Sequence, residues 1–301
     1  MKINRVRQNV LPVLAALIWG TAFVAQSVSA DYVEPFTFNA ARSAIAFIFL
    51  LALCLVRRGM QKGIVERVTK SWKDLSVGGT CCGVALTVAS NLQQKGLETT
   101  TSGKAGFITA LYIVIVPIVG IFMKKKAPRT LLISVPLAVA GLYCLCITED
   151  FTITEGDFYV FLCAICFSAH ILVIDHFTQK VDGVELSCVQ FLVATVLSSV
   201  GMIVSESPSL EAVGMCIWPI LYVGVFSSGV AYTLQILAQK DSNPTVVSLL
   251  LSLESVFATL AGAIILHDQM SIKEYFGCVL MLVAVVLAQL PEREKKAPQQ
   301  A

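Results

Sequence analysis

The amino-acid sequence predicts an all-α integral membrane protein with ten transmembrane helices, arranged as two inverted five-helix repeats. Three observations predict this fold: the composition, ten long apolar runs, and a one-sided distribution of lysine and arginine. The 301 residues are 56% hydrophobic and 14% charged, with a mean hydropathy of +0.78. Soluble domains carry about a quarter charged residues. Because this chain cannot cover itself with polar surface, lipid must be its solvent.

Ten runs of the sequence are uncharged or nearly uncharged and are about as long as a helix that crosses a membrane. They cover residues 10–28, 36–56, 75–93, 105–123, 131–147, 158–174, 187–204, 213–238, 246–266 and 272–290. The first run resembles a secretory signal, with cations before it and small residues after it. It is longer than the roughly 7–15 residues of a signal core. We therefore expect it to stay in the protein as the first transmembrane helix.

The run 105–123 is the clearest of the ten. Its 19 residues would rise about 28 Å as a helix, close to the ~30 Å hydrocarbon core of a bilayer. Three cations, 124–126, follow it directly. Pro117 has no backbone N–H, so one carbonyl loses its helical donor, which predicts that the helix bends or opens near mid-depth.

A second stretch with the same layout lies 143 residues further on, where Ser102 falls on Thr245. Both have a polar start, a long apolar helix, a charged end and another apolar helix, which indicates a duplication. Five helices per copy is an odd number, so the copies must lie upside down to each other. This is the inverted-repeat plan of secondary transporters, whose site lies near mid-membrane. We predict repeats over residues 1–148 and 149–290, and a disordered cytoplasmic tail over 291–301.

Lysine and arginine lie mainly on one side of the predicted helices. Of the 22 such residues, 18 fall in the N-terminal segment, the tail and the connections on the same side, three fall in connections on the other side, and Arg42 alone falls inside a run. Cytoplasmic connections of membrane proteins carry this excess. We therefore predict a multi-pass protein of the cell membrane with both termini in the cytoplasm. The net charge of +2 gives no indication of a nucleic-acid partner.

Two charged residues lie within the apolar runs and are the main candidates for a site. A lipid-facing arginine at depth costs at least ~2.5–3.5 kcal/mol, so Arg42 should face a partner or a wet cavity. It could anchor a carboxylate or phosphate, act as a gate, or tie helices together. Glu254 is the only acid deep in a run. It could carry a proton, since a buried carboxyl group can hold one, pair with a cationic solute, or make a structural hydrogen bond.

Six further side chains are candidates for a mid-membrane cavity, each with packing as the alternative: Trp19, Thr21, Thr109, Tyr112, His170 and Tyr232. Thr109 and Tyr112 share one helix face by their spacing. His170 could sense pH, although a hydrogen-bonded packing histidine is the favoured reading. Gln93 and Gln235 stand near helix ends, where we favour polarity at a helix interface over the lining of a vestibule.

The sequence predicts no catalytic residue, metal ligand or cofactor. Nearly all of the ten cysteines lie in apolar runs, where they behave as small hydrophobes. The spacing Cys163-x-x-Cys166 suits a metal or a redox pair, but no second pair or histidine cluster accompanies it. The G-x-x-x-x-G-K-[ST] and G-x-S-x-G patterns are both absent from the sequence, so we expect neither an ATPase motor nor a hydrolase.

The chain resembles the EamA-like transporters of the drug/metabolite transporter superfamily over residues of about 10–290. The likeness is carried by four motifs: Leu14-Ala-Ala-Leu-Ile-Trp-Gly-Thr21, Phe38-Asn-Ala-Ala-Arg-Ser43, Gly106-Phe-Ile-Thr-Ala-Leu-Tyr-Ile-Val-Ile-Val-Pro117 and Leu253-Glu-Ser-Val-Phe257. A fifth fragment, Leu266 to Ser271 followed by Gly277, is similar to a family signature. It departs from that signature at His267 and Asp268, and Ser255 stands where relatives commonly carry proline.

The resemblance implies a membrane transporter of a small metabolite or drug, with export the common direction and alternating access the mechanism. Its partners would be a small-molecule solute and the lipid bilayer. Neither the substrate nor the oligomeric state follows from it. The alternative is a membrane helper subunit without transport activity, or an intramembrane enzyme. That alternative would require a catalytic cluster or a soluble partner-binding segment, and the sequence contains neither.

Overall fold

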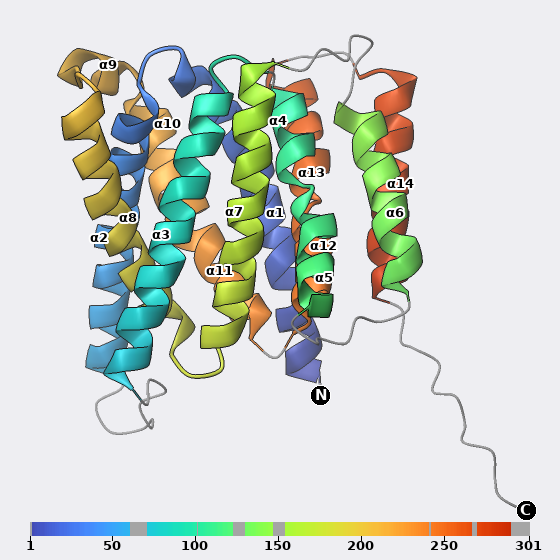
Figure 1. Cartoon of the computed structure of the whole chain (residues 1–301), viewed down its shortest axis with the longest axis horizontal. Helices are drawn as coiled ribbons and strands as arrows, with labels where there is room; N and C mark the ends of the chain where they lie inside the picture. Colours follow the sequence, from blue (N-terminus) through green and yellow to red (C-terminus); the bar gives the residue numbers. More distant parts are fainter. Residues whose placement is uncertain are drawn as a thin grey trace, which may run out of the picture.

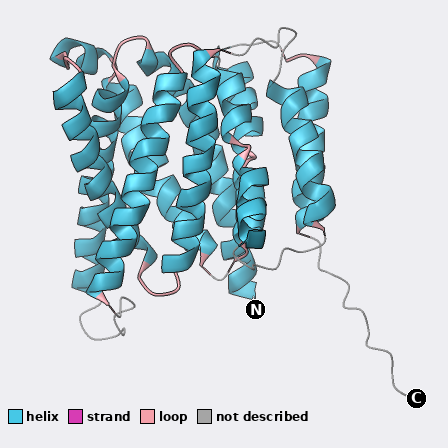
Figure 2. Ribbon diagram, viewed as in Figure 1, coloured by secondary structure: helices cyan, strands magenta, loops and turns pink. Residues whose placement is uncertain are grey.

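A computed structural model describes residues 2–60, 71–100, 102–122, 130–146, 154–240, 242–266 and 270–289. Over these residues the regular structure is helical and contains no strand (Figure 2). The helices lie side by side and roughly parallel in one bundle (Figure 1). The all-α prediction is therefore confirmed for the described part of the chain.

Each of the ten predicted runs corresponds to one helix or to consecutive short helices. The first half contains α1 (Lys2–Ala30), α2 (Pro35–Met60), α3 (Trp72–Gly96), α4 (Ser102–Thr109), α5 (Tyr112–Phe122) and α6 (Leu131–Cys146). The second half contains α7 (Glu155–Phe177), α8 (Gly183–Ser205), α9 (Leu210–Met215), α10 (Ile217–Tyr222), the π-helix η1 (Val223–Ala231), α11 (Tyr232–Gln239), α12 (Pro244–Leu251), α13 (Glu254–Ala261), the π-helix η2 (Gly262–Leu266) and α14 (Ile272–Ala288). The predicted tail 291–301 lies outside the described residues, as do His267 and Asp268.

Eight helical stretches of the described chain are long and apolar enough to cross a membrane. They are Gln8–Ala30, Pro35–Met60, Trp72–Gly96, Lys104–Phe122, Glu155–Phe177, Gly183–Ser205, Ile217–Gln239 and Pro244–Ile265. The other two predicted helices, α6 and α14, have 16 and 17 residues. They pack against each other, and Gly141 and Gly277 allow the close approach, since a Cβ on Gly277 would lie 2.7 Å from the Gly141 carbonyl oxygen.

Several helices begin where the sequence supplies a capping side chain. Thr154 and Asp157 form a capping box at the start of α7, and Ser271 and Glu274 form another at the start of α14. The Asp182 carboxylate accepts from two backbone N–H groups at the start of α8. These contacts satisfy amide donors that have no partner within the helix.

Two of the predicted runs are interrupted helices. The run 105–123 breaks at residues 110–111, between α4 and α5, and the run 246–266 breaks at Ser252 and Leu253, between α12 and α13. At both breaks the backbone makes tighter i to i−3 hydrogen bonds, such as Ile113 N to Ala110 O at 3.0 Å. Pro117, where we predicted an opening, lies inside α5. The interruption comes before it, where residues of the two halves contact each other.

The helices α2 and α8 run antiparallel and are joined at both ends. At one end, the Glu206 carboxylate accepts from the Phe36 and Thr37 backbone N–H groups, both at 2.7 Å. At the other end, Arg57 forms a bidentate pair with Asp182 at 3.1 and 3.2 Å. Charged hydrogen bonds thus link the two helices at both ends, with packed side chains between them.

Candidate functional site

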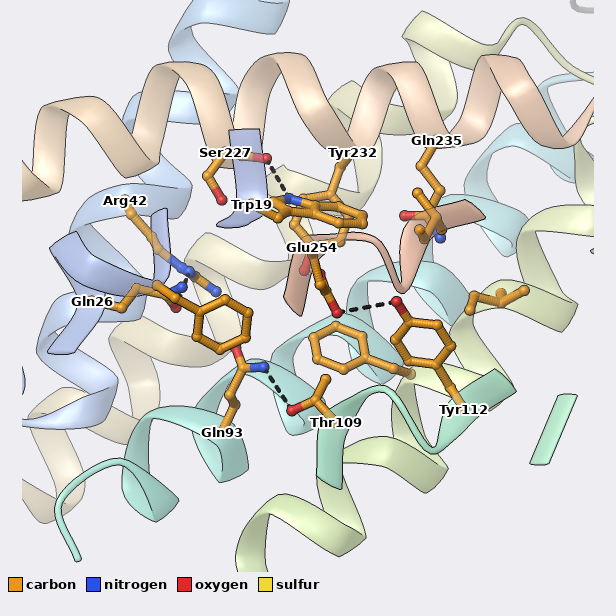
Figure 3. Close-up of a pocket in the computed structure, with 14 residues that line it drawn as sticks. Trp19, Gln26, Arg42, Gln93, Thr109, Tyr112, Ser227, Tyr232, Gln235 and Glu254 are labelled. Atoms are coloured by element: carbon orange, nitrogen blue, oxygen red, sulfur yellow. Dashed lines mark hydrogen bonds between the residues drawn. The ribbon is translucent and has the colours of Figure 1, made fainter. Parts of the chain in front are cut away.

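The two interrupted helices meet at a small cavity inside the bundle (Figure 3). Its volume is about 40 Å³. A buried water needs roughly 10–15 Å³ of such volume, whereas ligand pockets measure about 300–1,000 Å³. In this conformation the cavity therefore has room for a few waters. Its wall comes from both halves: Trp19, Phe23, Gln26, Arg42, Gln93, Thr109, Tyr112, Phe167, Ile171, Ser227, Tyr232, Gln235, Leu251 and Glu254.

Tyr112 and Glu254 connect the two interrupted helices across the cavity. The Tyr112 hydroxyl donates to Glu254 Oε1 at 3.0 Å, and both side chains are buried. Each residue is the first of the helical segment that follows a break, in α5 and α13. The close approach of α1 places Glu254, since a Cβ on Gly20 would lie only 2.8 Å from its backbone oxygen.

Arg42 enters the cavity from α2 and is only 4% exposed. One of its N–H groups donates to Gln26 Oε1 at 3.0 Å, and its guanidinium lies 5.6 Å from the centre of the Phe38 ring. The Nε atom has no hydrogen-bond partner within the described residues. None of the ion pairs formed among those residues includes Arg42. A buried guanidinium with five N–H donors is thus only partly satisfied.

An aromatic wall closes another side of the cavity. The rings of Trp19 and Tyr232 pack edge to face, with centroids 4.8 Å apart. Trp19 Nε1 donates to the Ser227 backbone oxygen at 3.2 Å. Ser227 belongs to the π-helix η1, and π-helical turns often occur at functional sites.

Two glutamines complete the polar lining. Gln93 Nε2 donates to Thr109 Oγ1 at 3.2 Å and joins α3 to α4. The Gln235 Oε1 atom is buried and has no hydrogen-bond partner among the described residues. We expected Gln93 and Gln235 to add polarity at a helix interface; in the structure both side chains also line the cavity.

The structure brings six of the eight predicted side chains to this cavity: Trp19, Arg42, Thr109, Tyr112, Tyr232 and Glu254. Thr21 points elsewhere and shares a 2.5 Å hydrogen bond with the Tyr222 hydroxyl. His170 lies behind the wall, bonded through Nε2 to Gln190 Oε1 at 3.1 Å, with its ring against Tyr232. The binding roles of all eight residues stay predictions.

Of the other lining residues, Gln26 is a polar side chain within an apolar run and is a signal that the sequence does contain, whereas Phe23, Phe167, Ile171, Ser227 and Leu251 give none. Phe167 and Ile171 have the spacing of ordinary packing residues in an apolar helix. Ser227 contributes a backbone oxygen from a π-helix that composition does not reveal. Within the described residues, no group of three or more His, Cys, Asp and Glu side chains could hold a metal ion.

The helical bundle, with eight stretches long and apolar enough to cross a membrane, defines a multi-pass helical membrane protein, and its candidate site is a cavity lined by residues of both halves. A model of the EamA-like transporter family matches residues 8–147 and again residues 154–290. The chain therefore belongs to the EamA-like transporter family, and it is a membrane transporter. This membership favours transport of a small solute over catalysis.

Two relatives agree with this assignment, and one solved structure shares the fold. An uncharacterized transporter of Archaeoglobus fulgidus is 31% identical over 280 residues, which cover 92% of this chain and 84% of the relative. The uncharacterized transporter YoaV of Bacillus subtilis is 20% identical over 277 residues, covering 90% and 92%. A solved crystal structure superposes with a TM-score of 0.77 at 19% identity, covering 94% of this chain and 96% of its own. The latter likeness supports the fold alone.

Proposed function

We propose that the chain is a secondary transporter that exports a small metabolite or drug from the cytoplasm across the cell membrane by alternating access. Ten membrane helices would form two inverted five-helix repeats, over residues 1–148 and 149–290. The two separate family matches, one in each half, support a duplication. The excess of lysine and arginine supports cytoplasmic termini. In agreement, the start of α1 and the end of α14 lie on the same face of the bundle (Figure 1). Export is the direction that the family resemblance favours.

One observation carries this proposal: both halves contribute an interrupted helix to the same cavity. The first residues after the breaks, Tyr112 and Glu254, are 142 positions apart and hydrogen-bonded. Interrupted helices at a repeat interface are a recurring way to build a solute site at mid-membrane, because irregular backbone is tolerated at that depth where it is buried in protein or lines a water-filled cavity.

The small volume of the cavity bears on how a solute would enter it. A cavity of about 40 Å³ is smaller than a metabolite, so solute entry requires the surrounding helices to separate. The Tyr112–Glu254 hydrogen bond joins the two interrupted helices and would have to break or shift as the cavity widens. In the proposed cycle this conformation would correspond to a closed state.

Glu254 is our candidate for proton coupling. Its carboxyl group is buried and lies at the solute cavity, so a proton on it could be exchanged when the cavity opens to either side. Arg42, Tyr112 and Tyr232 line the same cavity and would sense that change of charge.

The test is flux in liposomes that contain the purified full-length protein. Solute uptake and proton movement are recorded together for amino acids, purines and cationic drugs. We expect saturable flux and counter-exchange, with proton movement that disappears in Glu254→Gln. Glu185→Gln is the matched control, because this acid pairs with Arg58 at the end of α2. A folded protein that moves none of these solutes under any gradient would contradict transport. Equal proton movement in Glu254→Gln would contradict coupling through this residue.

A further inference from the structure

The cavity contains one basic and one acidic side chain that do not pair with each other. Arg42 comes from α2 and Glu254 from α13, and both line the cavity. They are 4% and 5% exposed. Neither belongs to any ion pair found among the described residues. Figure 3 shows Gln26 beside Arg42 and Tyr112 beside Glu254, so that each charge has a neutral hydrogen-bond partner.

The surroundings of the two charges differ in hydrogen-bonding character. At Arg42 the spare capacity is donor capacity, because the buried Nε has no partner within the described chain. A guanidinium fork matches the two oxygens of a carboxylate or phosphate. Glu254 supplies acceptor capacity, and the same cavity is lined by a further acceptor, the Gln235 Oε1 atom, which has no hydrogen-bond partner among the described residues. Aromatic faces such as those of Trp19 and Tyr232 attract cations.

This arrangement selects against solutes of a single charge. Charged side chains within a membrane protein are costly unless they meet a partner. While Glu254 is ionised, a monoanion would satisfy Arg42 and leave the Glu254 carboxylate without a cationic partner, and a monocation would do the reverse. A solute with both an oxyanion and an amine satisfies both residues at once.

We propose that the solute is a zwitterion, whose carboxylate or phosphate group binds Arg42 and whose cationic amine binds Glu254. This inference rests on the proposed transport function, since it names the substrate class of the same cavity. If Glu254 also carries the proton, the amine and the proton occupy its carboxylate in turn. The two residues then determine specificity through charge, while the aromatic wall contacts the apolar part of the solute.

The experiment compares solutes that share a carbon skeleton and differ in charge. For several skeletons, binding to the purified full-length protein is measured for an α-amino acid, its amide, its N-acetyl derivative and its N-acetyl amide. These are a zwitterion, a cation, an anion and a neutral molecule. Aminoalkylphosphonates separate phosphate-like from carboxylate recognition. A lost charged hydrogen bond corresponds to roughly a ten- to hundredfold change in affinity, so we expect the zwitterion to bind at least about tenfold more tightly than its singly charged forms.

The variants test each end separately. In Arg42→Gln we expect the zwitterion and the amide to bind alike, and in Glu254→Gln the zwitterion and the N-acetyl derivative to bind alike. Arg58→Gln and Glu185→Gln remove charges that pair outside the cavity and should leave the preference unchanged. Arg42→Lys retains a charge and should keep part of the preference if Arg42→Gln does not fold.

Three results would overturn the inference. The first is that a form with one charge or none binds most tightly. The second is that no zwitterion binds. The third is that the order of affinities of the four forms stays the same in both Arg42→Gln and Glu254→Gln. Flux in liposomes separates this inference from the transport proposal. Zwitterion binding without flux would retain the inference and contradict transport, whereas saturable flux of singly charged solutes alone would do the opposite.

Discussion

The hydroxyl of Tyr112 donates a 3.0 Å hydrogen bond to Oε1 of Glu254, across the boundary between the two halves of the chain. Both residues are buried, and each begins the second segment of an interrupted helix. One hydrogen bond thus connects the two least regular parts of the bundle. Its removal should change how readily these segments open.

Tyr112→Phe keeps the ring and removes the donor. Leaving a buried polar group without its partner costs about 1–3 kcal/mol. We therefore expect the backbone around both helix interruptions to open locally more often than in the wild type. Hydrogen–deuterium exchange should become faster in peptides that cover residues 108–114 and 250–256. Tyr159→Phe removes a comparable bond to Glu155 at an exposed site and should leave these peptides unchanged. Unaltered exchange in both peptides would show that the bond does not hold the breaks closed.

Gly20→Ala should disturb the site without replacing any of its polar side chains. A Cβ at this position would lie 2.5 Å from Phe257 Cβ and 2.8 Å from the Glu254 oxygen. Overpacking of this kind costs about 1–3 kcal/mol, so we expect a lower melting temperature and weaker solute binding. Gly59→Ala is the control, because nothing lies within 4 Å of its added Cβ. Equal behaviour of the two variants would contradict a tight α1–α13 contact.

Trp19→Phe should weaken the link between α1 and the π-helix η1. It retains an aromatic ring near Tyr232 and removes the N–H that donates to Ser227 O at 3.2 Å. A neutral hydrogen bond contributes about 0.5–1.5 kcal/mol, so solute affinity should fall by roughly ten-fold or less. Equilibrium binding measures the change. Trp218→Phe, at an exposed position of α10, should not alter affinity, and an equal loss there would point to a general effect on folding.

Asp182 gives a pH prediction at one end of the α2–α8 pair. Burial alone would raise the pKa of its carboxyl group, but the Arg57 guanidinium and two backbone N–H groups outweigh this, so that the pKa lies below its ordinary value. A carboxyl group of this kind stabilises the fold above its unfolded pKa of about 3.9 and loses that contribution as the pH falls through the lower folded value. Asp182→Asn should therefore melt at a lower temperature than the wild type at pH 7, by a margin that shrinks below about pH 4.

Thermal unfolding from pH 7 to pH 3 measures this margin. Asp31→Asn changes an exposed carboxyl group beyond the end of α1 and should show a much smaller difference at every pH. A margin for Asp182→Asn that stays constant down to pH 3 would contradict the stabilising role of the ionised pair.

Much of the fold could be predicted from the sequence because lipid exposure requires long apolar runs. The starts of α7 and α14 are also determined by nearby residues, since the side chains of both capping boxes lie within the first turn of each helix. The location of the interruption could not be predicted in this way. Pro117 is tolerated within α5, whereas the break depends on contacts between distant segments, such as the Tyr112–Glu254 bond.

The candidate site could be predicted in part for a similar reason. Arg42 and Glu254 were found because a charge in an apolar run must face the interior. Thr21 and His170 were placed in the cavity as well, yet they point to Tyr222 and Gln190. A helix that is apolar on most sides gives little information about its rotation, so sequence alone could not separate lining residues from their neighbours.

The double attachment of α2 to α8 has a mechanical consequence. The two helices are bonded at both ends, through Glu206 and through Arg57, so they should move together as one rigid body while those bonds hold. Arg42 lies on this rigid pair, whereas Glu254 lies on an interrupted helix, whose two segments can change their relative orientation. The distance between the two charges would then depend on the movement of α13 alone. The length of the solute that fits between them would show how far α13 has moved relative to α2.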